Sequence, residues 1–349
     1  MKSPVLVLAA AATLFLAACS SGGQPETSPS ASTDPAMSSA AAEANPAADA
    51  LKVSVAFYPI EFAASKVGAD KIAVTTLTTP GTEPHDLELT PQQIAGLDEA
   101  DLVVYLGGFQ PAVDKAVEAS KAKHKLDLAT VIDLHPISAD GHDHDHGDEK
   151  GHDDHADDEG HDDHASEEAH DDHDHGGVDP HYWLDATLMA KSVDAIAAGL
   201  GTIDATNKET YEANAKSTVA ELTALDEEYK GGLATCSVRT VITTHAAFGY
   251  LTERYDLKQV GISGLSPNEQ PSPARIAEVQ QEAKENGVTT IFFETLTSPE
   301  VAQSIAGDLG LKTAVLDPLE GVTPDSQGTD YPSIMKANLK SLQEANGCS

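Results

Sequence analysis

Positive charge is scarce in this sequence: 21 Lys and Arg residues stand against 57 Asp and Glu residues, and the formal net charge at pH 7 is −36. Nucleic-acid binding is therefore disfavoured, because attraction to phosphates needs a basic face. Residues 140–175 alone contain 17 acidic residues and one Lys, but the rest of the chain is also acidic. An acidic chain that also contains 15 histidines is suited to binding cations.

Cysteine is also rare, and the first of only three cysteines ends a signal-like segment. The basic start Met1-Lys2 precedes the apolar run VLVLAAAATLFLAA, which is long enough for a signal peptide and short for a membrane span. The following LAAC, with Cys19 last, matches the bacterial lipobox, in which the mature chain begins at a lipidated Cys. We expect a signal peptide over residues 1–18 and a flexible Ser-, Ala- and Pro-rich tether over 19–50. An ordinary signal peptide is the alternative.

The lipobox indicates an extracytoplasmic protein, anchored by lipid to the cell membrane. In such an oxidising compartment, the remaining pair Cys236 and Cys348 predicts a disulfide, with two free thiols as the alternative. Roughly 300 residues follow the tether, which is enough for two domains.

Strand and helix patterns alternate in two series. β-Branched segments such as LKVSVAFYPI (51–60) predict strands, and segments such as TPQQIAGLDEAD, with Thr90 as N-cap, predict helices. We expect an α/β fold of two lobes with mostly parallel sheets, over 51–203 and 231–349. Residues 204–230 predict one long linker helix between them, capped by Asp204 or Thr206 and stopped by Gly231-Gly232.

Three histidines lie at or near the predicted ends of strands or the start of a helix: His85, His181 and His245. Taken singly, each could be a surface or capping residue. Together they favour a shared site, because ligands of open α/β sheets bind beyond the carboxyl ends of the strands. Three imidazoles and one carboxylate oxygen would complete a tetrahedral zinc site between the lobes.

The fourth ligand is open at this point. Asp317, in TAVLDPLEG, is the best-placed carboxylate because it follows a predicted strand in the second lobe. Glu83, two residues before His85, and Glu294, in IFFETLTSP, are the alternatives, together with water.

The segments TEPHDLELTPQQIAGLDEADLVVYLG, DPHYWLD and VITTHAAFGYL resemble the three histidine motifs of the metal-binding lipoproteins of ABC importers. The chain is similar to the zinc-specific, ZnuA-like members of that family over nearly all of residues 51–349. The resemblance implies two pseudo-symmetric lobes joined by a long helix, with the metal in the interlobe cleft. It also implies His85, His181, His245 and Asp317 as ligands, and because all three histidines are kept, it favours zinc over manganese.

Residues 140–177 contain repeated His-Asp units, which are low-complexity metal-binding signals, and they lie where the zinc members of the family often carry a His-rich loop. The high charge and the near absence of apolar side chains predict a disordered segment. We interpret it as an accessory, weak zinc collector or sensor; a solvating acidic loop is the alternative. Its ten histidines are His142, His144, His146, His152, His155, His161, His164, His170, His173 and His175.

These features predict a high-affinity zinc receptor that delivers Zn²⁺ to an ABC permease. We expect a monomer and no enzyme activity; whether a zinc metallochaperone loads the site is open. A manganese or broad divalent-metal receptor and a surface adhesin of the same fold are alternatives. A zinc hydrolase is a remote one, because no H-E-x-x-H motif is present.

Overall fold

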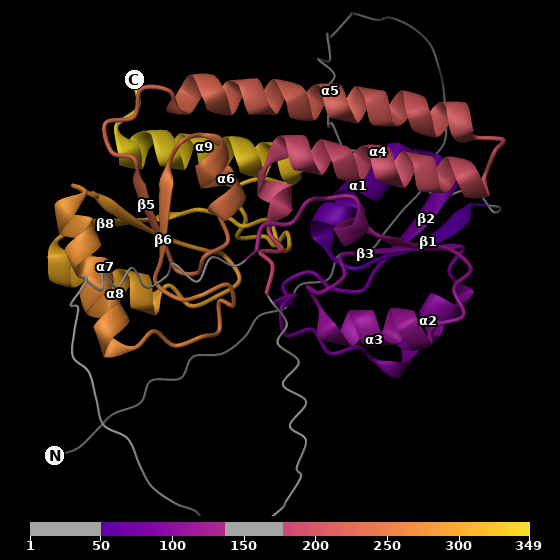
Figure 1. Ribbon diagram of the computed structural model, residues 1–349, viewed down its shortest axis with the longest axis horizontal. Helices are drawn as coiled ribbons and strands as arrows, with labels where there is room; N and C mark the ends of the chain where they lie inside the picture. The colour runs from indigo at the N-terminus through magenta and orange to yellow at the C-terminus, as the bar shows by residue number, and fades with distance from the viewer. Residues whose placement is uncertain (1–49, 137–176) are drawn as a thin grey trace, which may run out of the picture. The chain divides into compact units, whose positions relative to one another are not determined.

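The strands form two parallel sheets of four strands each (Figure 1). This computed structural model describes residues 50–136 and 177–349. The signal peptide, Cys19, most of the tether and the ten histidines of the accessory loop are expectations that lie outside the described residues. No helix within the two described ranges is both long and apolar enough to cross a membrane.

The first sheet, with its helices, makes the N-terminal lobe and has the strand order β2-β1-β3-β4. All of its neighbouring strands pair in parallel. Its strands are β1 (Leu51–Val55), β2 (Ile72–Thr76), β3 (Leu102–Tyr105) and β4 (Lys125–Asp127). Its helices are α1 (Tyr58–Gly68), α2 (Pro91–Glu99) and α3 (Pro111–Ala119), with short 3-10 turns at Ala69–Lys71 and Leu128–Thr130.

The second sheet makes the C-terminal lobe and repeats the same arrangement, with the order β6-β5-β7-β8 and parallel pairing throughout. The predicted α/β fold with two similar lobes is confirmed. Its strands are β5 (Thr240–Thr243), β6 (Lys258–Gly261), β7 (Thr290–Phe293) and β8 (Lys312–Val315). Its helices are α6 (Gly249–Arg254), α7 (Pro273–Glu285) and α8 (Glu300–Leu309).

Local signals set the ends of several elements. Thr90 caps α2 as predicted: its hydroxyl accepts the Gln93 N–H, and Pro91 occupies the first turn. The first strand is shorter than the predicted segment 51–60. It ends at Val55, and α1 begins at Tyr58. Pro59 lies in the first turn of α1, where its fixed φ favours a helix and its missing N–H costs no hydrogen bond.

The long helix α5 (Lys208–Leu233) begins and ends later than predicted. Asp204 does not cap it; its carboxylate accepts hydrogen bonds from the backbone and side-chain N–H groups of Asn207, directly before the helix, and from the Tyr211 hydroxyl within it. Gly232 does not stop it either. A Cβ there would lie 2.6 Å from Nε2 of Gln343 in α9 (Tyr331–Asn346), so this glycine allows two helices to approach closely.

Helix α5 joins the two lobes. Its 26 residues span roughly 39 Å at 1.5 Å per residue, and it packs along α4 (Ala186–Ile203) while contacting α1 and α9 (Figure 1). The predicted disulfide between Cys236 and Cys348 is present, and it ties the end of α5 to the chain after α9.

The larger of the two apolar clusters among the described residues runs from the N-terminal lobe through α4, α5 and α9 into the C-terminal lobe, which also contains the smaller one. Trp183, in the 3-10 turn Tyr182–Leu184, belongs to the larger cluster and is fully buried, with its ring in an edge contact with Phe57. Its indole N–H donates to the carbonyl of Pro318, just after β8, at 2.7 Å. The segment before α4 is therefore held against the C-terminal lobe.

Candidate metal centre

His85 lies in the loop between β2 and α2. Its backbone N–H donates to Glu83 Oε1 at 2.9 Å, and the edge-to-face contact with Phe109 places the two ring centroids 4.8 Å apart. The side chain of Gln110 holds the loop by donating to the Pro84 carbonyl at 3.0 Å. The position of the imidazole thus follows from a local acidic turn and from aromatic packing.

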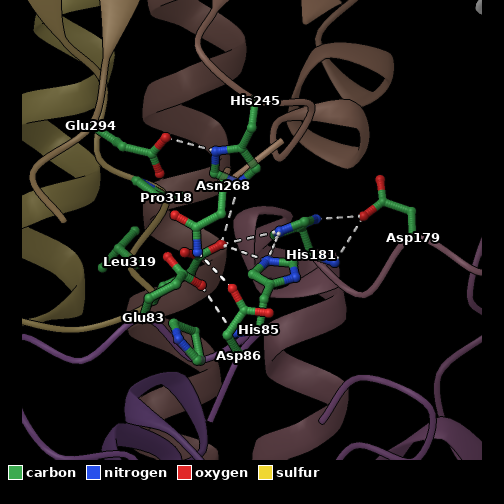
Figure 2. A network of polar contacts seen from close by, with 12 residues as sticks. Glu83, His85, Asp86, Asp179, His181, His245, Asn268, Glu294, Pro318 and Leu319 are labelled. Carbon is green, nitrogen blue, oxygen red and sulfur yellow. Dashed lines mark hydrogen bonds and ion pairs between the residues drawn. The ribbon is translucent and has the colours of Figure 1, made fainter. Parts of the chain in front are cut away.

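His181 is fully buried directly before the turn that contains Trp183. Asp179 Oδ1 contacts it twice, accepting the backbone N–H at 2.9 Å and lying 2.7 Å from ring Nδ1. This carboxylate fixes the ring orientation and leaves Nε2 facing the other two histidines (Figure 2).

His245 follows β5 and is 1% exposed. Its Nδ1 lies 2.8 Å from Glu294 Oε1, which also accepts the Thr244 hydroxyl at 2.9 Å. The carbonyl of His245 accepts the Thr243 hydroxyl at 2.6 Å. As with His181, a buried carboxylate on Nδ1 directs Nε2 toward the other histidines (Figure 2).

The three Nε2 atoms converge on one carboxylate, that of Glu320. Glu320 Oε1 lies 3.3 Å from His85, 3.1 Å from His181 and 3.4 Å from His245. All four donor atoms lie within 4.8 Å of one another, and they form the group suited to hold a metal among the described residues. Residues of both lobes, far apart in the sequence, therefore lie together in this group.

Asp317 was the expected fourth ligand, but it lies outside this group. It is nevertheless buried, with 1% of its surface exposed. Its Oδ1 accepts the N–H of Leu319 at 2.8 Å, and its backbone is bound at both N–H and carbonyl by the Asn338 amide. These contacts turn the chain after β8, with Leu319 at φ 59°, a left-handed conformation unusual for this residue type. The turn presents Glu320, not Asp317, to the histidines.

The other two candidate carboxylates also lie outside the group of four. Glu83 accepts the backbone N–H of His85, and Glu294 holds the Nδ1 of His245. Each therefore positions a histidine, as Asp179 does for His181.

Neither Glu320 nor Asp179 was predicted from the sequence. The sequence signal for Glu320 is the Asp-Pro pair that begins three residues before it, because such a pair favours a turn. The carboxylate at the strand end, Asp317, then stabilises the turn. The signal for Asp179 was its place two residues before His181, the spacing of an Asx turn.

Opposite charges dominate the electrostatics of the group. Burial by itself would lower the pKa of His245, but the contacts with Glu294 and Glu320 raise it to about 10. His181 is affected similarly: burial opposes the shift, yet Asp179 and Glu320 raise its pKa. Burial would raise the pKa of Glu320, but its contacts with the three histidines hold it well below its ordinary value. The buried carboxylates thus favour the protonated forms of His181 and His245 in the metal-free protein.

Burial and the charge of Glu320 raise the pKa of Glu83 to about 8.

His245 Nε2 and Glu320 Oε2 are buried without a hydrogen-bond partner. Buried polar atoms are rarely left in this state, and a cation bound by the four side chains would contact His245 Nε2. Three imidazole nitrogens and one carboxylate oxygen are a donor set that fits tetrahedral zinc.

Comparison with known proteins agrees with this geometry. A protein of Bacillus subtilis named high-affinity zinc uptake system protein ZnuA is 38% identical over 314 residues, which cover 88% of this chain and 91% of that protein. The zinc-binding lipoprotein AdcA of Streptococcus pneumoniae serotype 4 is 33% identical over 350 residues. That match covers 99% of this chain but 61% of AdcA, so the chain spans about three fifths of the length of this relative.

A similar solved structure is the Zn(II)-bound ZnuA-like domain of AdcA from Streptococcus pneumoniae. It superposes with a TM-score of 0.65 and 30% identity, over 85% of this chain and 99% of that domain. The family model described as zinc-uptake complex component A, periplasmic, matches residues 53–345. This chain belongs to the ZnuA family of zinc-uptake components.

Proposed function

We propose that this protein is an extracytoplasmic receptor that captures Zn²⁺ with high affinity and delivers it to an ABC permease. The observation that carries the proposal is the convergence of three imidazole Nε2 atoms on Glu320 Oε1, with all four donors within 4.8 Å. The names of the relatives, a zinc uptake protein and a zinc-binding lipoprotein, support Zn²⁺ as the cargo.

The donor set supports a receptor and not a catalyst. Four protein ligands close a tetrahedral zinc site, whereas catalytic zinc keeps one position for water. Each buried histidine, His181 and His245, is oriented by its own carboxylate, so the ion would meet a preformed site. Both family membership and this closed geometry favour binding and transport.

The exposure of the ligands suggests how the ion reaches them. The side chain of His85 is 11% exposed, whereas those of His181, His245 and Glu320 are 0–1% exposed. We infer that Zn²⁺ enters and leaves past His85, which belongs to the N-terminal lobe. The other three side chains form the buried part of the proposed site.

The remaining parts of the proposal depend on the sequence. A lipid on Cys19 would hold the receptor at the membrane, close to its permease. The ten histidines of residues 140–177 would collect zinc weakly, and a zinc metallochaperone would be a partner that loads the tight site. We also propose that the receptor acts as a monomer.

A metal titration of two variants tests the proposal. Deleting residues 141–176 should remove several weak zinc equivalents and keep one tight equivalent, measured against a chelator with manganese as competitor. His245→Ala in the full chain should lose the tight equivalent and keep the weak ones. Loss of the tight site on deletion, or a preference for manganese in the deleted protein, would contradict the proposal.

A further inference from the structure

Helix α6 begins four residues after His245 and contacts the 3-10 turn Tyr182–Leu184, which directly follows His181. Its buried Tyr250 makes the first contact. The Tyr250 hydroxyl donates to the carbonyl of Asp179 at 2.8 Å and accepts the N–H of His135, also at 2.8 Å. Because the Asp179 carboxylate orients His181, this hydroxyl fixes the backbone of the residue on which the ring depends.

Gly249 makes the second contact. A Cβ at this position would lie 2.8 Å from Asp179 Oδ2, which is closer than real Cβ contacts. The first turn of α6 therefore approaches the Asp179 carboxylate so closely that any side chain would displace it. The other oxygen of that carboxylate is the one that contacts His181 Nδ1.

Arg254, one helical turn after Tyr250, makes the third contact. Its guanidinium binds Asp226 of α5 through two hydrogen bonds, at 2.6 and 2.8 Å, and its Nε lies 3.4 Å from Asp185 Oδ1. Asp185 caps α4 by accepting the Thr187 N–H at 2.7 Å. Helix α6 therefore contacts the chain on both sides of His181, at Asp179 and at Asp185.

We propose that α6 is a positioning helix of the metal centre: Gly249, Tyr250 and Arg254 hold the His181 segment in register with His245, which lies directly before the helix. This inference rests on the proposed zinc function. A metal ion joins ligands from both lobes only if the lobes are held in register, and α6 supplies contacts that link the two histidines without itself donating a ligand. Loosening α6 should weaken zinc binding and distort the coordination without unfolding the protein.

Two pairs of variants in the full chain test the proposal. Gly249→Ala would push the Asp179 carboxylate away from His181, while the control Gly231→Ala introduces the same methyl into α5, where nothing lies within 4 Å. Tyr250→Phe removes the bridging hydroxyl, while the control Tyr211→Phe removes a buried hydroxyl that binds Asp204 at the α4–α5 turn. The measurements are the tight zinc dissociation constant, the visible absorption of the Co²⁺ form, and the unfolding transition of the metal-free protein.

We expect Gly249→Ala to raise the zinc dissociation constant about 10- to 100-fold, as for loss of a carboxylate that orients a ligand. Tyr250→Phe should raise it about 5-fold, the equivalent of one hydrogen bond. Both should alter the Co²⁺ spectrum, and both controls should leave affinity and spectrum unchanged. The inference is overturned if Tyr250→Phe matches Tyr211→Phe in affinity and spectrum. A wild-type protein without a tight zinc site would instead refute the proposed function itself.

Discussion

Replacing Glu320 by Gln removes one negative charge from the centre of the site while keeping the size of the side chain. Glu320 is fully buried, and its Oε1 lies 3.1–3.4 Å from three imidazole nitrogens. Removing one partner of such a buried charged contact costs about 3–5 kcal/mol. The zinc dissociation constant should therefore rise about 150- to 5,000-fold.

The protons that compete with zinc reduce this effect. Glu320 also raises the pKa of His245 and His181, so Glu320→Gln weakens the binding of the competing protons as well as of the metal. We therefore expect the observed change at pH 7 to lie at the lower end of this range, about 150-fold. Competition with a chelator of known zinc affinity measures it directly.

Asp317→Asn is the matched control, because it removes the same charge three residues earlier in the same loop. The amide oxygen can still accept the Leu319 N–H, so the turn should persist and zinc affinity should fall by no more than about 10-fold. If Asp317→Asn removed the tight site and Glu320→Gln kept it, the assignment of Glu320 would be wrong.

Three further predictions concern protons, ligand orientation and stability. Zinc must displace the proton of His245, because the pKa of this residue is raised to about 10. Between pH 9 and pH 5, zinc affinity should therefore fall about tenfold per displaced proton for each unit of pH. A zinc affinity that does not change with pH, measured by competition with a chelator, would contradict this. Glu294→Gln should weaken zinc about 10- to 100-fold by the same assay, and unchanged affinity would remove Glu294 from its orienting role. Replacing Cys236 and Cys348 by Ser opens a link between residues 112 positions apart and should lower the free energy of unfolding in denaturant by up to about 4–5 kcal/mol. This double variant should keep its zinc affinity. Loss of the tight site would show that the disulfide is needed for the geometry of the metal centre.

Periodicity and strand ends were enough to predict the two lobes, because short β-branched strands alternate with amphipathic helices in both halves. The same strand ends pointed to His85, His181 and His245, which the structure brings within a few ångströms of Glu320. Their role as ligands stays a prediction until metal binding is measured.

The fourth member of the group could not be selected in this way. Strand position favoured Asp317, but which carboxylate faces the histidines depends on the turn that follows β8. That turn is held by Asn338, which is 21 residues later in the chain, and by the Trp183 indole, which is 135 residues earlier than Pro318. Such long-range contacts leave no periodic signal. The end of α5 was missed for a similar reason, since Gly232 serves the packing of α9.

The coordination of bound zinc tests the central claim most directly. X-ray absorption at the zinc edge should be recorded on protein lacking residues 141–176 and loaded with one equivalent of zinc. We predict three imidazole nitrogens at about 2.0–2.1 Å and one carboxylate oxygen at about 2.0–2.2 Å. The oxygen should be lost or replaced in Glu320→Gln. Fewer than three imidazoles, or a shell unchanged in Glu320→Gln, would contradict it.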